Sequence, residues 1–398
     1  MSYKKVKISD IGKIVSGATP KTKDVDNYGG SIAWITPADL SGYTSKYISH
    51  GSRNITQKGY DSCSTHLMPR GTVLFSSRAP IGYVAIAENP ICTNQGFKSI
   101  VPNDDIDSEF LYYQLQYLRK KIQEKGSGTT FKEISGKVLG ETDIVVPSLE
   151  EQSRIVARIE ELFSELDKAV DTLKTTKEQL EVYRQAVLVD IFSQEHPLRQ
   201  LKEISVALSG FAFKSKNYTP DGKYTVIKIG NVKDGYLDFS RDKTRTNEVT
   251  DRILQKYLLK QGDCLITLTG TRGKRDYGFV SMIERQTDYL LNQRVAALRF
   301  DTMIALPEFF RYYLSSLNYR NQFFKYETGN VGQGNVGIKA LCEPAVPCPP
   351  LDTQKKIVEQ ISDRLSVCDS IEKTVDTALA QADAMRQSIL KQSFEEKI

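Results

Sequence analysis

A long segment of the sequence occurs twice, and the two copies align without a gap. The first copy runs from Pro147 to Phe192 and the second from Pro349 to Phe394, at a constant offset of 351 − 149 = 202 residues. The matched residues of the first copy include Leu149, Gln152, Ile155, Val156, Ile159, Asp167, Arg184, Gln185 and Phe192. This repeat constrains the fold strongly, because both copies are expected to adopt the same structure.

The segments that precede the two copies also match, but with an offset that drifts. The matched ranges are 11–17 with 204–210, 35–40 with 227–232, 70–74 with 261–265, 93–95 with 291–293, and 109–113 with 308–313. A drifting offset indicates shared strands and helices that are separated by loops of different length. Short β-like runs and one aromatic helix candidate in each region favour a mixed α and β structure. We therefore predict an α+β protein with globular regions at 1–148 and 196–350, long helices at 149–195 and 351–398, and pseudo-two-fold internal symmetry.

Apolar residues recur in both copies at alternating steps of three and four, which is the heptad pattern of a coiled coil. The expected seam of the first helix is Ile155, Ile159, Leu162, Leu166, Ala169, Leu173, Leu180, Tyr183 and Val187, with a polar interruption at Thr176. The expected seam of the second is Ile357, Ile361, Cys368, Ile371, Val375, Ala378, Ala382, Met385 and Ile389, with Arg364 as an interruption.

A helix of this length with one apolar stripe has to bury the stripe against a partner. Ser148 and Glu151 form a capping box at the start of the first helix, and two prolines introduce the second. The chain must return from the end of one helix before the next globular region starts, so an antiparallel coiled coil is the simpler pairing. The alternative is that each helix packs only onto its own globular region.

Composition excludes several classes of protein but selects none. The chain has 54 Lys and Arg against 49 Asp and Glu, and the net charge of +5 permits a nucleic-acid partner without establishing one. We find no apolar run of about 18 residues and no signal-peptide core, so we expect a cytoplasmic protein without a membrane span. The six cysteines form no C-x-x-C pair and the three histidines lack ligand spacing, so we expect reduced thiols and no metal site.

Motifs for catalysis are also missing from the sequence. It contains neither a G-x-S-x-G motif nor a Walker-type loop. The segment 220–223 is best explained as a turn, and the glycine-rich segment 329–337 as a polar loop. We therefore predict no catalytic residues in this chain.

Loops of both globular regions carry cationic and hydrogen-bonding side chains that suit DNA. Arg bonds guanine and Asn or Gln bonds adenine in the major groove, whereas Lys, Ser and Thr suit phosphates. Such loops are also ordinary solvated surface, and the Asn-Gln pairs are equally consistent with caps at strand ends. The candidates are Lys21, Ser76, Ser77, Arg78, Tyr83, Asn94, Gln95, Lys98, Thr129, Thr130, Lys132, Lys214, Lys216, Thr269, Thr271, Arg272, Lys274, Arg275, Tyr277, Asn292, Gln293, Asn330, Gln333 and Asn335.

The whole arrangement resembles the specificity subunit of Type I restriction-modification enzymes. The residues that carry the resemblance are 145–156 with their second copy 347–358, the helix-end pair 183–188 and 385–390, and the segment 129–134. The second globular region departs from this pattern, because it has 334–338 in place of the threonine-rich segment.

The resemblance implies a function as well as a fold. The globular regions would be target-recognition domains that each read half of a bipartite DNA site, and the antiparallel helices would set the spacer between the halves. Two modification subunits that bind S-adenosylmethionine would methylate adenine N6, and restriction subunits would add ATP- and Mg²⁺-dependent translocation and cleavage. The chain itself would bind double-stranded DNA and would not be an enzyme.

Two other classes of function stay open at this point. A stand-alone duplicated DNA-binding regulator would bind its site tightly and specifically as an isolated chain. A self-sufficient enzyme, such as a nuclease, would show methyl transfer or cleavage without partners.

Overall fold

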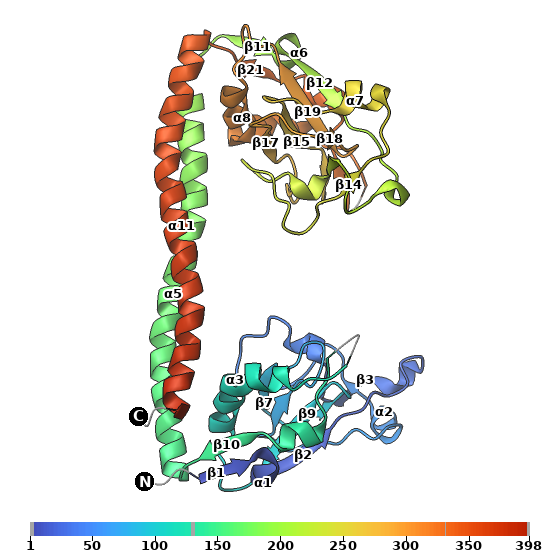
Figure 1. Ribbon diagram of the computed structural model, residues 1–398, viewed down its shortest axis with the longest axis vertical. Helices are drawn as coiled ribbons and strands as arrows, with labels where there is room; N and C mark the ends of the chain where they lie inside the picture. The colour runs from blue at the N-terminus through green and yellow to red at the C-terminus, as the bar shows by residue number, and fades with distance from the viewer. Residues whose placement is uncertain (1–3, 129–131, 331, 396–398) are drawn as a thin grey trace. The chain divides into compact units, whose positions relative to one another are not determined.

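The chain folds into two compact units, each of which combines one globular region with parts of both long helices. The computed structural model describes residues 4–128, 132–330 and 332–395 (Figure 1). Unit 1 comprises residues 1–173 and 377–398, and unit 2 comprises residues 174–376. Contacts thus divide the chain differently from the four consecutive segments that the sequence suggests, because each long helix contributes to both units.

The globular part of unit 1 is built on a five-stranded sheet with the strand order β2-β9-β6-β7-β5. The strand β6 lies inside this sheet because all of its residues are apolar and fully buried. The strands of the sheet are β2 (Gly12–Ser16), β9 (Lys98–Pro102), β6 (Val73–Phe75), β7 (Val84–Ala87) and β5 (Tyr47–Ile48). Two smaller pairs are β1 (Lys4–Lys7) with β10 (Asp143–Val146) and β4 (Trp34–Ile35) with β8 (Cys92–Thr93), and β3 spans Tyr28–Ile32.

The globular part of unit 2 is built on a four-stranded sheet with the order β12-β19-β15-β17. Its strands are β12 (Ser205–Ser209), β19 (Val295–Phe300), β15 (Cys264–Thr267) and β17 (Val280–Met282). The smaller sheets are β14 (Arg245–Thr246) with β13 (Tyr224–Ile227) and β18 (Tyr289–Leu291), β11 (Leu198–Gln200) with β21 (Ala345–Pro347), and β16 (Thr269–Gly270) with β20 (Gly334–Asn335). Four strands of the unit 1 sheet thus have equivalents here, in the same order and with the same antiparallel pairing. This equivalence confirms the predicted internal repeat.

Short helices cover the sheets of both units. In unit 1 they are α1 (Ile8–Ile11), α2 (Gln57–Asp61), α3 (Ser108–Glu124) and α4 (Gly136–Gly140), with 3₁₀ turns η1 (Val25–Asn27) and η2 (Pro37–Leu40). In unit 2 they are α6 (Leu201–Ile204), α7 (Asp251–Tyr257), α8 (Pro307–Ser315), α9 (Leu317–Phe323) and α10 (Ile338–Leu341), with η3 (Ser215–Asn217), η4 (Ile229–Asn231) and η5 (Phe324–Tyr326). Among the helices described, none combines the length and the apolar character needed to cross a bilayer.

The long helices α5 (Leu149–Phe192) and α11 (Leu351–Glu395) pair in antiparallel fashion. Within unit 2, Lys177 contacts Asp376 at 2.7 Å and Arg184 contacts Asp369 at 2.6 Å, so residue numbers rise along one helix as they fall along the other. Within unit 1, the equivalent ion pair joins Arg386 to its α5 partner at position 167. The repeat offset of 202 relates this pair to the Arg184–Asp369 pair, and the pairing confirms the predicted antiparallel coil.

Each helix also packs onto the globular parts, so the alternative considered from the sequence holds in part. Ile155, Val156 and Ile159 of α5 belong to the core of unit 1, and they share it with Leu390 of α11. The core of unit 2 takes residues from both helices in the same way, namely Val187, Leu188, Ile191, Phe192, Ile357 and Ile361. The first part of one helix and the last part of the other therefore enter the same core.

The seam between the helices follows a register that the apolar pattern did not fully predict. Most of the expected seam residues are buried or partly buried, but four are exposed and these four predictions are wrong. Tyr183 is 49% exposed, Ile371 is 40% exposed and Met385 is 54% exposed, and Ala169 is also exposed. The residues that directly follow Ile371 and Met385, namely Glu372 and Arg386, are partly buried instead. Arg386 packs over the Phe163 ring at 5.0 Å while its charge pairs across the seam. Charged seam residues of this kind fix the register and orientation of a helix pair.

A buried glutamine at the start of each long helix ties the helix to its globular part. The Gln152 side-chain oxygen accepts a hydrogen bond from the Asp107 N–H at 2.8 Å, and its amide donates to the carbonyls of Asp105 and Pro147. Gln354 repeats this arrangement with the Leu306 N–H at 2.7 Å and with the carbonyls of Ile304 and Pro349. Each glutamine therefore satisfies two backbone groups just before α3 or α8 and one just before its own long helix.

Replacing Gln354 with leucine is expected to lower the free energy of unfolding by about 2 kcal/mol, because buried N–H and C=O groups lose their partners. Urea unfolding followed by circular dichroism measures this loss. Gln360, which is exposed on the same helix, gives the matched control, and Gln360→Leu should change stability by less than about 0.5 kcal/mol. Equal stability of the two variants would show that the Gln354 hydrogen bonds do not contribute.

Candidate nucleic-acid interface

Each unit presents one loop that connects two neighbouring strands of its main sheet. Tip loop 1, residues 77–82, connects β6 to β7, and tip loop 2, residues 268–278, connects β15 to β17. Tip loop 2 is the longer of the two, and it carries more cationic residues. Because the flanking strands are equivalent, the two loops occupy the same place in the two units.

A buried hydroxyl closes the base of each tip loop in the same manner. In unit 1, the Ser76 Oγ accepts a hydrogen bond from the Tyr83 N–H at 2.7 Å and donates to the Pro80 carbonyl at 2.7 Å. In unit 2, the Thr267 Oγ1 accepts a hydrogen bond from the Phe279 N–H at 3.0 Å. The two loops thus differ in sequence and length but begin and end on equivalent anchors.

Two further segments pair with each tip loop through backbone hydrogen bonds. In unit 1, the Ser77 N–H donates to the Gly96 carbonyl at 2.7 Å, and the Ile134 N–H donates to the Ser77 carbonyl at 3.0 Å. In unit 2, the equivalent bonds join Leu268 N–H to the Arg294 carbonyl at 3.1 Å and Val336 N–H to the Leu268 carbonyl at 2.9 Å. The structure therefore brings together, in each unit, three segments that are far apart in the sequence.

These segments hold most of the sequence-predicted DNA-binding residues. In unit 1 they carry Arg78, Tyr83, Asn94, Gln95, Lys98 and Lys132, all of them at least partly exposed. In unit 2 they carry Thr269, Thr271, Arg272, Lys274, Arg275, Asn292, Gln293, Asn330, Gln333 and Asn335, which are also at least partly exposed. The geometry gives each unit one surface on which cations lie beside amides, the combination that phosphate and base-edge contacts require.

Intramolecular contacts already hold several of these side chains in place. Arg78 lies 3.6 Å from the Glu133 carboxylate, and Arg272 donates to the Gly329 carbonyl at 2.5 Å. The Asn94 side chain accepts a hydrogen bond from the Gly96 N–H at 2.8 Å, and Gln95 bonds Thr19. The interpretation of the Asn-Gln pair as a strand-end cap therefore holds for Asn94.

Three sequence-predicted contact residues are buried, and we remove them from the candidate interface. Ser76 and Ser77 are fully buried, and the Ser76 hydroxyl is used for loop closure. Tyr277 is also fully buried, and its hydroxyl donates to Glu327 at 2.8 Å. The Ser76 and Tyr277 hydroxyl groups are bonded within the protein, and all three side chains are shielded from solvent. The predicted contacts Thr129 and Thr130 lie outside the described residues.

Each of the remaining lysine candidates comes after a glycine at which two backbone segments of the same unit lie close together. Gly17 packs against the carbonyls of Thr93 and Asn94, where a Cβ atom would clash, and Gly210 packs in the same way against Asn292. Exposed lysines follow each glycine along the chain, namely Lys21 in unit 1 and Lys214 and Lys216 in unit 2. This approach brings the start of each lysine segment to the Asn-Gln segment of the same unit.

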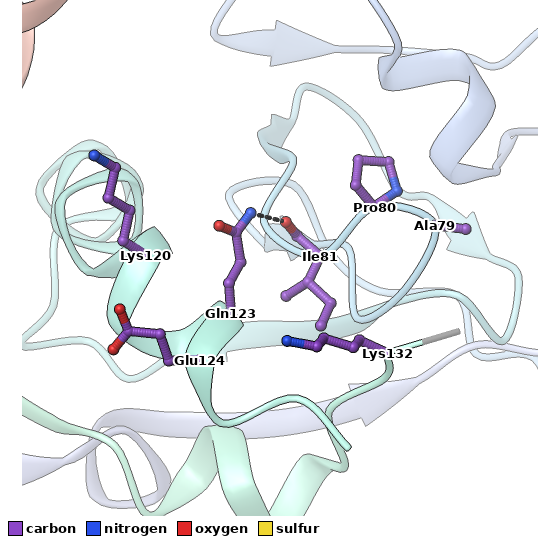
Figure 2. A pocket seen from close by; sticks show the side chains of 7 residues that line it. All are labelled: Ala79, Pro80, Ile81, Lys120, Gln123, Glu124 and Lys132. Atoms are coloured by element: carbon purple, nitrogen blue, oxygen red, sulfur yellow. Dashed lines mark hydrogen bonds between the residues drawn. The ribbon is translucent and has the colours of Figure 1, made fainter. Parts of the chain in front are cut away.

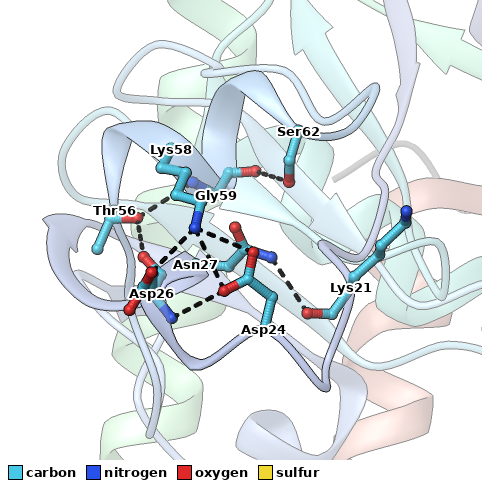
Figure 3. A network of polar contacts seen from close by, with 8 residues as sticks. All are labelled: Lys21, Asp24, Asp26, Asn27, Thr56, Lys58, Gly59 and Ser62. Atoms are coloured by element: carbon cyan, nitrogen blue, oxygen red, sulfur yellow. Dashed lines mark hydrogen bonds and ion pairs between the residues drawn. The ribbon is translucent and has the colours of Figure 1, made fainter.

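A polar network that the sequence analysis missed supports the Lys21 segment (Figure 3). The Asn27 amide donates to the Lys21 carbonyl at 3.1 Å, and Lys58 of α2 forms ion pairs with Asp24 and Asp26 at 3.1 and 3.0 Å. The Lys58 ammonium lowers the pKa of the Asp24 carboxyl. Lys58 thus offsets part of the negative charge that the two acids place near Lys21, the lysine that we expect to face DNA.

An open cavity of about 540 Å³ adjoins tip loop 1 (Figure 2). Ala79, Pro80 and Ile81 of the loop line one side, and Lys120, Gln123 and Glu124 of α3 line the other, with Lys132 beside them. Within the described ranges, we find no group of three or more His, Cys, Asp or Glu residues that is suited to hold a metal ion. The arrangement offers charged and hydrogen-bonding groups to a ligand.

Sequence comparison shows which family shares this architecture. The family described as "Type I restriction modification DNA specificity domain" matches residues 2–182 and 195–381, which cover both globular parts and most of both helices. The chain belongs to this family. The two matched ranges follow the internal repeat, as expected when one ancestral specificity domain has been duplicated.

Individual relatives agree with the assignment to the specificity family. The chain is 46% identical over 177 residues to the Type I restriction enzyme MjaIX specificity subunit of Methanocaldococcus jannaschii, and this match covers 44% of the chain and 40% of that protein. It is 22% identical over 422 residues to the EcoBI specificity subunit of Escherichia coli, covering 99% of the chain and 85% of that protein. A solved chain from a study of complex assembly in a type I R-M system has the same fold, with a TM-score of 0.71 at 18% identity, and the match covers 100% of this chain and 98% of that one.

Proposed function

We propose that this specificity subunit reads a bipartite DNA site, one half with each globular part. The observation that carries the proposal is the repeated arrangement of three segments around each tip loop, on equivalent anchors but with different side chains. Phosphate contacts would supply affinity that depends on salt, and base-edge contacts would supply sequence choice. The half-sites would lie on the order of one helical turn apart, as duplicated readers generally require.

The two half-sites should differ in sequence, because the two loop surfaces differ in chemistry. Tip loop 1 offers one arginine, Arg78, whereas tip loop 2 offers Arg272, Lys274 and Arg275. Sequencing of modified bases in a host that expresses the chain with its methyltransferase should reveal an unequal two-part motif. A palindromic motif would contradict the proposal.

The proposal includes partner subunits that carry out the chemistry. Two modification subunits would bind S-adenosylmethionine, and they would flip and methylate an adenine in each half of the site. Restriction subunits, where present, would use ATP and Mg²⁺. The chain itself would be non-catalytic and, because its ligand is DNA, cytoplasmic. A stand-alone regulator would instead need no partner, and specific binding by the isolated chain without any effect of a methyltransferase would favour that class.

Neutralising one lysine of tip loop 2 tests the phosphate-contact part of the proposal. Lys274→Gln should weaken binding of all sequences alike and reduce the slope of log affinity against log salt concentration by about 0.9, the value for one lost phosphate contact. Fluorescence anisotropy at several salt concentrations measures this slope. Lys202 of α6, which pairs with Glu343, gives the control variant Lys202→Gln with an expected unchanged slope. An unchanged slope for Lys274→Gln would remove Lys274 from the interface.

A further inference from the structure

Both tip loops contain a residue that is held in an unfavourable backbone conformation. Ala79 has a φ of 53° and Arg275 a φ of 54°, and each stands three residues ahead of a glycine with positive φ, Gly82 or Gly278. Across the described ranges, these two are the residues other than glycine with positive φ. The left-handed region costs a residue with a Cβ atom about 1–2 kcal/mol, so it persists only where the surroundings enforce it. The same strain at the same loop position in both units calls for a common cause.

In unit 2 the enforcing group is Arg320 of α9. Its Nη2 atom donates to the carbonyls of Arg275 and Tyr277, both at 3.0 Å. The Arg320 side chain is only 13% exposed, and its other terminal nitrogen lies 3.9 Å from the Asp234 carboxylate. One nearly buried guanidinium therefore bonds the strained residue and the residue two positions after it.

In unit 1 the enforcing groups are Gln123 and Arg119 of α3. The Gln123 amide points to tip loop 1 and donates to the Ile81 carbonyl at 2.6 Å (Figure 2). Arg119 packs so closely on Gly82 that a Cβ atom there would lie 2.6 Å from its Cγ atom. The hydrogen bond and the packing contact both fix the end of the loop that follows Ala79.

The two clamps are equivalent in the repeat. Arg119 lies over the Tyr83 ring at 5.8 Å, and Arg320 lies over the Phe279 ring at 5.3 Å. Each ring belongs to the residue directly after the positive-φ glycine. Cation–π contacts of this kind add about 0.5–2 kcal/mol when they are shielded from water. The same type of contact thus joins a helix to the base of each tip loop, although the loops themselves differ.

The clamping helices are rigid parts of the two cores. Ile122 lies beside Gln123 in α3 and is fully buried in the unit 1 core, and Phe323 of α9 is buried in the unit 2 core. Functional loops that must present side chains with sub-ångström accuracy require such support. A clamp on such a helix would set where the loop side chains point.

We propose that Arg320 and Gln123 are positioning residues that set the sequence selectivity of the half-site read by their own unit, without contacting DNA. The proposal rests on the proposed function, because it takes the tip loops to be the elements that read DNA. It differs from a general structural role in one respect. Loss of one clamp should relax the choice of bases in one half-site and leave the other half-site intact.

The test uses the full-length chain with Arg320→Lys or Gln123→Glu and selection from a duplex library that is randomised at both half-sites. Lysine keeps the charge but loses the planar fork, and glutamate has no donor for the Ile81 carbonyl. Arg320→Lys should reduce base discrimination in the half-site of unit 2 about tenfold, as expected for the loss of one charged hydrogen bond, with the other half-site unchanged. Gln123→Glu should have the reverse pattern.

Each variant carries its own control, because the untouched half-site reports whether the chain is folded. Arg252→Lys, at an exposed position on α7, should leave both half-sites unchanged. Equal relaxation of both half-sites, or unchanged discrimination in both, would overturn the inference. If the wild-type chain, with or without its methyltransferase, selects no two-part motif, the proposed function fails first and the inference fails with it.

Discussion

Inserting three heptads into both long helices is expected to lengthen the preferred DNA spacer by about nine base pairs and to leave both half-sites unchanged. The insertions follow Leu173 in α5 and Asp376 in α11, as three copies of residues 167–173 and 370–376. Asp376 pairs with Lys177 at 2.7 Å, so the two insertion points are close across the seam. Twenty-one residues add about 31 Å of helix, which is the length of about nine base pairs.

The number of heptads follows from the twist as well as the length. A left-handed coil with a pitch of about 150 Å turns by about 75° over this insertion. DNA has about 10.5 base pairs per right-handed turn, so nine base pairs rotate one half-site by about 310° relative to the other. This orientation is the same as a left-handed rotation of about 50°. The two rotations agree to within about 25°. One heptad would add about three base pairs but would leave the two rotations more than 100° apart, so it should fail to restore tight binding at any spacer.

Selection from a library with fixed half-sites and variable spacers measures the outcome. On the original spacer, the three-heptad variant should bind about 10³-fold more weakly than the wild type, because only one half-site is engaged specifically. The same insertion in α5 alone is the control, and it should disrupt the helix pair because α11 then lacks a matching segment. A changed half-site, or an unchanged spacer preference, would refute the role of the helices as a ruler.

The repeat explains why so much of this fold was predictable from the sequence. Gln152 and Gln354 recur at the constant offset, and both make the same three hydrogen bonds at the start of their helices. The sequence named candidate residues in separate loops, and the structure adds that the segments around Gly96, Ile134 and tip loop 1 lie together. Repetition identifies equivalent positions even where it does not say what they do.

The wrong predictions concern apolar residues that are exposed and polar residues that are buried. The apolar pattern selected Ile371 and Met385 for the seam, but the chain places Glu372 and Arg386 there, because long side chains can pack their stems and still pair their charges. Ser76 and Tyr277 looked like contact residues because both are polar, yet their hydroxyl groups close the loops from within. A single sequence does not distinguish a hydroxyl that faces DNA from one that bonds its own backbone.

The clamp residues were missed for a different reason. Gln123 lies 42 residues from its partner Ile81, and Arg320 lies 45 residues from Arg275. A single sequence does not show which helical polar residue meets a loop so distant along the chain. One sequence signal was available. Each tip loop ends on a glycine that is followed by an aromatic residue, Gly82-Tyr83 or Gly278-Phe279, and the clamping helix places an arginine over this aromatic ring.

Replacing Phe192 with alanine is expected to lower the free energy of unfolding by about 3–5 kcal/mol, as for other buried aromatic side chains. Phe192 ends α5 in the core of unit 2, where it is 6% exposed and contacts the rings of Phe309 and Tyr313 at 5.4 and 5.1 Å between ring centroids. The repeat-related Phe394 contacts Phe110 and Tyr117 in unit 1 but is partly exposed. Phe394→Ala should therefore cost less.

Urea unfolding gives the free energies, and half-site selection gives the functional consequence. Because Phe192 anchors α5 in unit 2, Phe192→Ala should weaken recognition of the unit 2 half-site first, whereas Phe394→Ala should affect the unit 1 half-site. Phe192→Leu keeps much of the buried volume and should lose less stability than Phe192→Ala. Equal and small effects of all three variants would mean that the contacts between the two long helices alone hold the helix ends. The aromatic contacts would then not contribute to holding each globular part on the helices.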